Sequence, residues 1–113
     1  MKIKQDLNIQ NLESRLEYFW QLSGRKIQLI KECYDASIGS PVYTVKGAYT
    51  TRGWTEWTEG FRTGSAIIQF DATGDTEFLE IGEQETVDTM ASHVSHIGVH
   101  DHGFNNISTY GNL

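Results

Sequence analysis

The tripeptide Thr73-Gly74-Asp75 constrains the fold of this chain more than any other segment. Glycine adopts the left-handed backbone conformation that ends a helix, and an aspartate can cap the next helix by accepting a hydrogen bond from a backbone N–H. Apolar residues recur at spacings of three and four on both sides of the tripeptide, which is the period of an amphipathic helix. The pattern therefore predicts two helices joined by a very short turn, the second of which ends before Gly98.

The first arm of this predicted hairpin begins near Thr58, and its apolar and small residues form a stripe along one face. We expect this stripe to face the core, and it consists of Phe61, Gly64, Ser65, Ile68 and Ala72, widened by Ile67 and Phe70. A stripe this broad predicts contacts on more than one side of the helix, and its small residues allow a neighbouring helix to come close.

Three further segments complete the expected all-α fold of one domain. Residues 8–35 repeat apolar side chains at helical spacing, with a bend or a split into two helices expected at Ser23-Gly24. Pro41 blocks helix at the residue before it. Residues 41–55 mix extended-chain formers with glycine, which predicts a loop, with a short strand pair as the alternative. A final helix is expected to begin after Asn105.

Charge is distributed unevenly along the chain. All nine Lys and Arg residues lie at or before Arg62, whereas the residues from Thr63 onward hold eight Asp and Glu and neither Lys nor Arg. Because binding to a phosphate backbone depends on cationic side chains, the sequence argues against nucleic acid as a partner. No apolar run approaches the roughly 18 residues of a membrane span, so no membrane partner is expected either.

The segment from Trp54 to Gly64 joins the predicted loop to the first arm of the hairpin. Trp54, Trp57 and Phe61 lie there with two carboxylates and Arg62. Flat aromatic faces stack on sugar rings, bases or cations, and they are costly to expose without a use. Two interpretations stay open: the aromatic side chains bind a ligand, or they are core anchors that hold the loop in place.

All four histidines of the chain fall within ten residues. In one interpretation His93 and His96, together with a residue from 100–102, ligate a metal, although the spacing matches no zinc motif. In the other, His100-Asp101 is a polar pair that lines a pocket, and Gly103 leaves room for a ligand. The carboxylate becomes a useful acid there if burial raises its pKa.

Three motifs occur in the order typical of one enzyme family: Trp57-Thr58-Glu59-Gly60-Phe61, Thr73-Gly74-Asp75 and His100-Asp101-His102-Gly103-Phe104. In these motifs residues 50–110 resemble the N-terminal third of glycoside hydrolase family 88, which contains the unsaturated glucuronyl hydrolases. The His-Asp-x-Gly-Phe loop is the specific part, because many α/α barrels carry Thr-Gly-Asp. The resemblance implies that residues 1–113 are the incomplete N-terminal part of a single catalytic domain, a six-hairpin (α/α)6 barrel.

The same resemblance implies a hydrolase that removes unsaturated uronic acid from oligosaccharides made by polysaccharide lyases. In such enzymes a proton is added to a ring carbon of the vinyl ether, water adds at the neighbouring carbon and the hemiketal then opens. By motif position, Asp101 is the catalytic aspartate of the His-Asp loop, and Trp57, Phe61 and His100 contact the substrate. No cofactor and no metal are implied. The family's main acid/base aspartate lies beyond Leu113, so we expect this chain by itself to be inactive.

Two residues depart from the family pattern. Arg62 stands where a bulky apolar or aromatic residue is commoner, and His102 stands where an aliphatic residue is commoner, which leaves the sugar specificity open. Two alternative functions also stay open: a metal-binding protein that uses the histidines of residues 93–102, and a sugar-binding module without catalysis that uses Trp54 and Trp57. A cytoplasmic location is expected, with the periplasm as the alternative.

Overall fold

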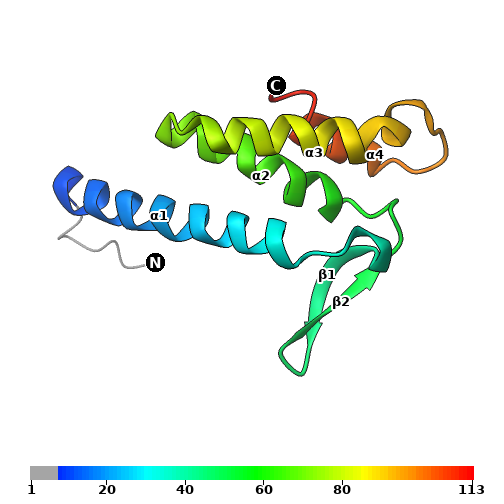
Figure 1. Cartoon of the computed structure of the whole chain (residues 1–113), viewed down its shortest axis with the longest axis horizontal. Helices are drawn as coiled ribbons and strands as arrows, with labels where there is room; N and C mark the ends of the chain where they lie inside the picture. Colours follow the sequence, from blue (N-terminus) through cyan, green and yellow to red (C-terminus); the bar gives the residue numbers. More distant parts are fainter. Residues whose placement is uncertain (1–7) are drawn as a thin grey trace.

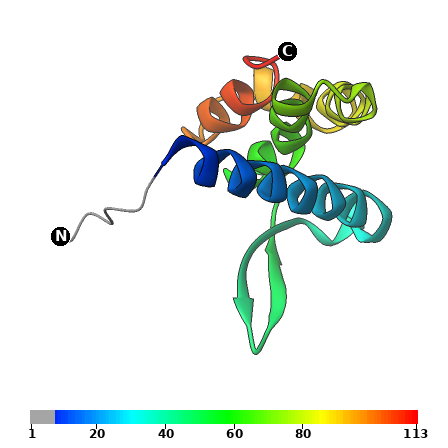
Figure 2. The ribbon, with the colours of Figure 1, turned by 90° about the vertical axis from the view of Figure 1, so that its left-hand side faces the viewer.

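The computed structural model describes residues 8–113, which form four α-helices and one β-hairpin (Figure 1). The elements in chain order are α1 (Ile9–Cys33), a short 3-10 turn (Ala36–Ile38), β1 (Ser40–Val45), β2 (Ala48–Arg52), α2 (Thr58–Thr73), α3 (Thr76–Ser95) and α4 (His102–Ser108). Helix α2 is the central element, because it packs against α1, α3, α4 and β1. The β-hairpin projects away from the helices (Figures 1 and 2).

The fold class predicted from the sequence is wrong. β1 and β2 pair as an antiparallel hairpin, so the chain is mixed α/β, and it does not show a fragment of an all-α six-hairpin barrel. Lys46 and Gly47 make the turn between the strands with φ values of 51° and 82°, and a two-residue turn with positive φ matches the twist of paired strands. The short strand pair forms because β-branched and aromatic residues dominate both strands.

Helix α1 runs without interruption, so the predicted split at Ser23-Gly24 is wrong. Asn8 caps the helix, because its side-chain oxygen accepts a hydrogen bond from the Asn11 N–H at 2.7 Å. Gly24 is buried against α3, and a Cβ atom added there would lie 2.9 Å from Cζ of Phe78. This glycine therefore serves close packing between two helices and does not break α1.

The predicted αα-hairpin is confirmed. Gly74 ends α2 in the left-handed conformation with φ 70°, and its N–H donates to the carbonyl oxygen of Phe70 at 2.7 Å. Asp75 caps α3, because its Oδ1 accepts a hydrogen bond from the Glu77 N–H at 3.1 Å. The helix of Thr76–Ser95 ends before Gly98, as the sequence indicates.

The buried face of α2 differs from the predicted stripe. Phe61 is 49% exposed and Ile68 is 47% exposed, although both were expected to face the core. The buried residues of this helix are Glu59, Gly60, Thr63, Gly64, Ala66, Ile67 and Gln69. The face is rotated because glycines on α2 admit α4: a Cβ atom added to Gly64 would lie only 1.9 Å from the carbonyl oxygen of Ser108.

We expect Gly64→Ala to lower the free energy of unfolding by about 2–3 kcal/mol, because the added methyl group meets backbone atoms of α4 that cannot rotate away. Gly103→Ala is the control, since nothing lies within 4 Å of a Cβ atom added there and alanine favours helix. Urea unfolding followed by circular dichroism measures both changes. Equal stabilities of the two variants would contradict the close packing of α2 against α4.

Candidate functional site

Two of the three motifs lie together, and the side chain of Asn105 joins them. Asn105 is fully buried on α4, and its Oδ1 accepts a hydrogen bond from the Gly60 N–H at 2.8 Å. Its Nδ2 donates to the carbonyl oxygen of Glu56 at 3.2 Å and lies 2.9 Å from Nδ1 of His93. Sequence reasoning treated Asn105 only as the start of a helix and missed this role, because nothing in the pattern marks its long-range partners.

The predicted sugar-stacking residues lie at the start of α2. Trp57 is 42% exposed and Phe61 is 49% exposed, and their ring centroids are 5.3 Å apart in an edge-to-face arrangement. Such a pair leaves aromatic surface free for a planar or ring-shaped ligand. Because both rings are partly exposed, neither is a fully buried core anchor.

The predicted His-Asp pair lies at the start of α4. This helix begins at His102, earlier than the predicted start after Asn105. Asp101 is the residue before the helix, but its side chain makes no capping hydrogen bond to it. Nε2 of His100 lies 3.2 Å from Oδ1 of Asp101, and the His100 side chain is 92% exposed. The carboxylate of Asp101 is thus partly exposed and is not used to cap the helix.

The other three histidines form a cluster with Trp54. Nδ1 of His93 lies 2.9 Å from Nδ1 of His102, and Nε2 of His102 lies 2.7 Å from Nδ1 of His96. The Trp54 ring stacks on the His102 ring with an interplanar angle of 14° and a centroid distance of 5.3 Å. The ring nitrogens face one another in pairs, and the described residues hold no group of three or more His, Cys, Asp or Glu that could hold a metal ion.

Burial lowers the pKa of two of these histidines. It lowers the pKa of His93, with the neighbouring His102 and His96 acting in the same direction and Glu59 opposing them. Burial also lowers the pKa of His102, again with His96, while Asp101 opposes the shift. Both effects disfavour a charge at the centre of the cluster.

Arg62 lies in a buried ion-pair network. Its Nη2 contacts Oε1 of Glu59 at 2.8 Å, and its Nη1 contacts Oε2 of Glu85 on α3 at 2.7 Å. The guanidinium lies 4.4 Å from the centroid of the Tyr34 ring, and Ser40 of β1 donates a hydrogen bond to Oε2 of Glu59. Burial acts to lower the pKa of Arg62, but the two carboxylates raise it more. This residue, which departs from the family pattern, therefore connects α2 with α3, β1 and the end of α1.

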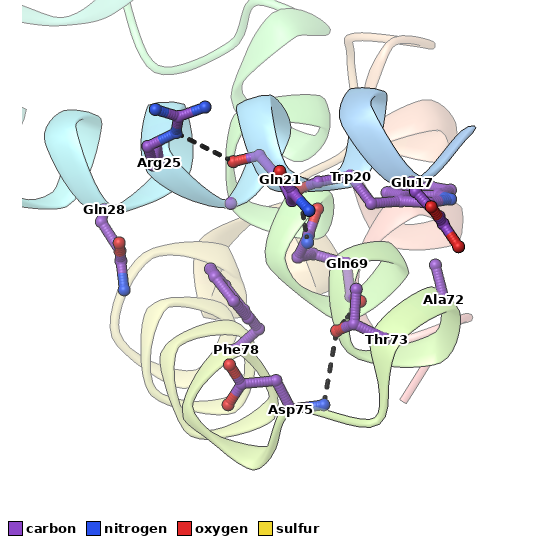
Figure 3. Close-up of a pocket in the computed structure, with 11 residues that line it drawn as sticks. Glu17, Trp20, Gln21, Arg25, Gln28, Gln69, Ala72, Thr73, Asp75 and Phe78 are labelled. Atoms are coloured by element: carbon purple, nitrogen blue, oxygen red, sulfur yellow. Dashed lines mark hydrogen bonds between the residues drawn. The ribbon is translucent and has the colours of Figure 1, made fainter. Parts of the chain in front are cut away.

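A hollow of about 500 Å³ lies at the opposite end of α2, between α1 and the α2–α3 turn (Figure 3). Trp20, Gln69 and Phe78 line it, and so does Asp75 of the Thr-Gly-Asp motif. Trp57 lies at the other end of this 16-residue helix, roughly 24 Å away along the axis. The hollow is therefore separate from the two motifs that Asn105 joins.

We expect Arg62→Met to lower the free energy of unfolding by about 3–5 kcal/mol, because it leaves two carboxylates without their shared counter-charge. The matched control is Arg52→Met. Arg52 is 59% exposed and its Nη1 lies 3.9 Å from Glu56, so its loss changes stability by less than about 1 kcal/mol. Chemical denaturation compares the two variants, and similar losses would contradict a structural role for the Arg62 network.

The lowered pKa values of His93 and His102 predict a pH-dependent stability. Below about pH 6.5, the ordinary value for histidine, the unfolded chain binds more protons than the folded chain does. Stability is therefore expected to fall as pH is lowered from about 7.5 to about 5.5. Thermal melts at each pH measure this, with His100→Gln as a control that keeps the dependence. A melting temperature that rises toward acid pH would refute it.

No helix among the described residues is long and apolar enough to cross a membrane. A comparison of the chain with protein-family models, with curated proteins and with solved structures found no match. The resemblance to glycoside hydrolase family 88 therefore rests on the three motifs themselves.

Proposed function

We propose that this chain supplies part of the substrate site of a glycoside hydrolase that removes unsaturated uronic acid from oligosaccharides made by polysaccharide lyases. One observation carries the proposal. Asn105 bonds the backbone of the Trp57–Phe61 segment to the helix that follows the His-Asp pair, across 45 residues of sequence. The two motifs that resemble the family thus belong to one local arrangement, which is what a shared site requires.

The chemistry of the residues fits the proposed roles. The exposed rings of Trp57 and Phe61 offer apolar faces to a sugar ring, which binds aromatic faces through its C–H groups. Asp101 has a carboxylate free of helix capping, and His100 lies beside it. In the proposed reaction a proton is added to the vinyl-ether carbon, water adds at the neighbouring carbon, and the hemiketal opens with release of the sugar. Asp101 assists the proton transfer, and the proposal places the enzyme in the cytoplasm.

A sugar-binding module without catalysis would use the same aromatic side chains, so the role of Asp101 separates it from the proposed hydrolase. A metal-binding function receives no support from the arrangement of the histidine rings. His102 directs its two ring nitrogens toward two different histidines, and the described residues hold no group of three or more His, Cys, Asp or Glu that could hold a metal ion.

We expect the chain to bind an unsaturated uronyl disaccharide, and Trp57→Ala to weaken this binding about tenfold, since the variant removes the stacking surface. Tyr49→Ala is the matched control, because this aromatic side chain is 72% exposed but lies on β2, in the hairpin that projects away from the helices. Isothermal titration calorimetry measures the affinities. Equal affinity of the wild-type chain and Trp57→Ala would exclude the aromatic segment from the sugar site.

In the form of the protein that turns over the sugar, Asp101→Asn is expected to lower kcat by about 10²–10⁴-fold, because the amide cannot transfer a proton. The affinity for the disaccharide should change little, since the substitution keeps the shape of the side chain. Loss of ultraviolet absorbance of the unsaturated bond reports turnover. An unchanged kcat would remove Asp101 from the mechanism, and binding without turnover would support the non-catalytic module.

A further inference from the structure

A continuous chain of polar contacts links three histidines to Asn105. It runs from His96 to His102, from His102 to His93 and from His93 to Asn105, with distances of 2.7, 2.9 and 2.9 Å. His93 is 2% exposed, His102 is 4% exposed and Asn105 is fully buried, so water is excluded from most of this series of contacts. The proposed sugar chemistry uses none of these four side chains.

Contacts of Asn105 determine where hydrogens lie at one end of the chain. Oδ1 accepts the Gly60 N–H, which fixes the orientation of the amide. The two hydrogens on Nδ2 then point to the carbonyl oxygen of Glu56 and to Nδ1 of His93. A nitrogen that accepts a hydrogen bond carries no proton, so His93 is neutral and holds its hydrogen on Nε2.

The remaining hydrogens follow from this assignment. Nδ1 of His102 faces the unprotonated Nδ1 of His93, so it must donate and carries the hydrogen. In the neutral ring Nε2 of His102 then accepts from Nδ1 of His96. Hydrogens from both Asn105 and His102 therefore point at Nδ1 of His93. An additional proton on that nitrogen takes up its single lone pair and faces both hydrogens, so neither contact persists with these tautomers.

This series of polar contacts holds several segments of the protein together. His93 and His96 lie at the end of α3, whereas His102 and Asn105 lie on α4. Trp54, from the loop before α2, stacks on His102. Asp101 directly precedes His102, so the position of its backbone depends on these contacts.

We propose that the series of polar contacts that links His96, His102, His93 and Asn105 is a proton-sensitive latch. With neutral histidines it holds the Asp101 loop and Trp54 against α3, and proton uptake at Nδ1 of His93 releases both. Glu59 of α2 favours the added proton on His93, while His96 and His102 oppose it, and Asp101 favours a positive charge on His102. The latch regulates the segment used in the proposed function, but it does not depend on the identity of the ligand.

Fluorescence of Trp54 tests the latch when Trp20→Phe and Trp57→Phe leave it as the single tryptophan. We expect its emission to shift to longer wavelength as pH falls below about 6.5, with unchanged helical circular dichroism. His93→Gln should abolish the shift, because glutamine can accept from Asn105 but does not titrate. His100→Gln, which removes the 92% exposed histidine outside the latch, should keep it.

Either of two outcomes overturns the proposal: the same transition in the His93→Gln variant, or loss of helicity with the same midpoint as the emission shift. If His93→Gln does not fold, nitrogen NMR of the histidine rings in the unsubstituted protein tests the proposed positions of the ring hydrogens. It should show His93 neutral at about pH 7.5 with its hydrogen on Nε2. A hydrogen on Nδ1 at that pH would overturn the latch. Failure of sugar binding would leave all these outcomes unaffected.

Discussion

The buried guanidinium of Arg62 fixes the start of α2, and the rest of the arrangement depends on that helix. Removing a charge from water is costly unless partners surround it, and here Glu59 and Glu85 each contact one terminal nitrogen at 2.8 and 2.7 Å. The two carboxylates come from α2 and α3, and Tyr34 covers the guanidinium from the end of α1. Because α2 contacts every other helix, this network positions the start of α2, where Trp57 lies, against α3 and the end of α1.

The candidate site also depends on the close approach of the α4 backbone to the α2 backbone. Gly60 and Gly64 lie where α4 crosses α2, and a Cβ atom at either position would overlap α4. The absence of side chains brings Asn105 within hydrogen-bond distance of the Gly60 N–H. The polar contacts of Asn105 and the histidine cluster follow from this approach, since they need the helices at short distance. Sterics and hydrogen bonding therefore act together to place α4, which follows the His-Asp pair, against the start of α2.

Some features of the fold were predictable because they depend on neighbours in sequence. The turn at Gly74 and the cap at Asp75 follow from backbone preferences of single residues, and both formed as predicted. The β-hairpin was open as an alternative but did not enter the predicted fold class, since strands and loops share similar composition in residues 41–55. The buried face of α2 was predicted wrongly: the small residues indicated that a neighbouring helix could come close, but apolar periodicity does not reveal which face that helix covers.

The sequence by itself determined the αα-hairpin, the uneven charge and the motifs that carry the resemblance, because these are properties of local patterns. Tertiary structure alone decided that Asn105 bridges two motifs and that Arg62 balances two carboxylates. It also decided that His93 and His102 are buried, which lowers the pKa of both side chains. Each of these depends on residues far apart in the chain, whose distance is set by packing and is not encoded by spacing.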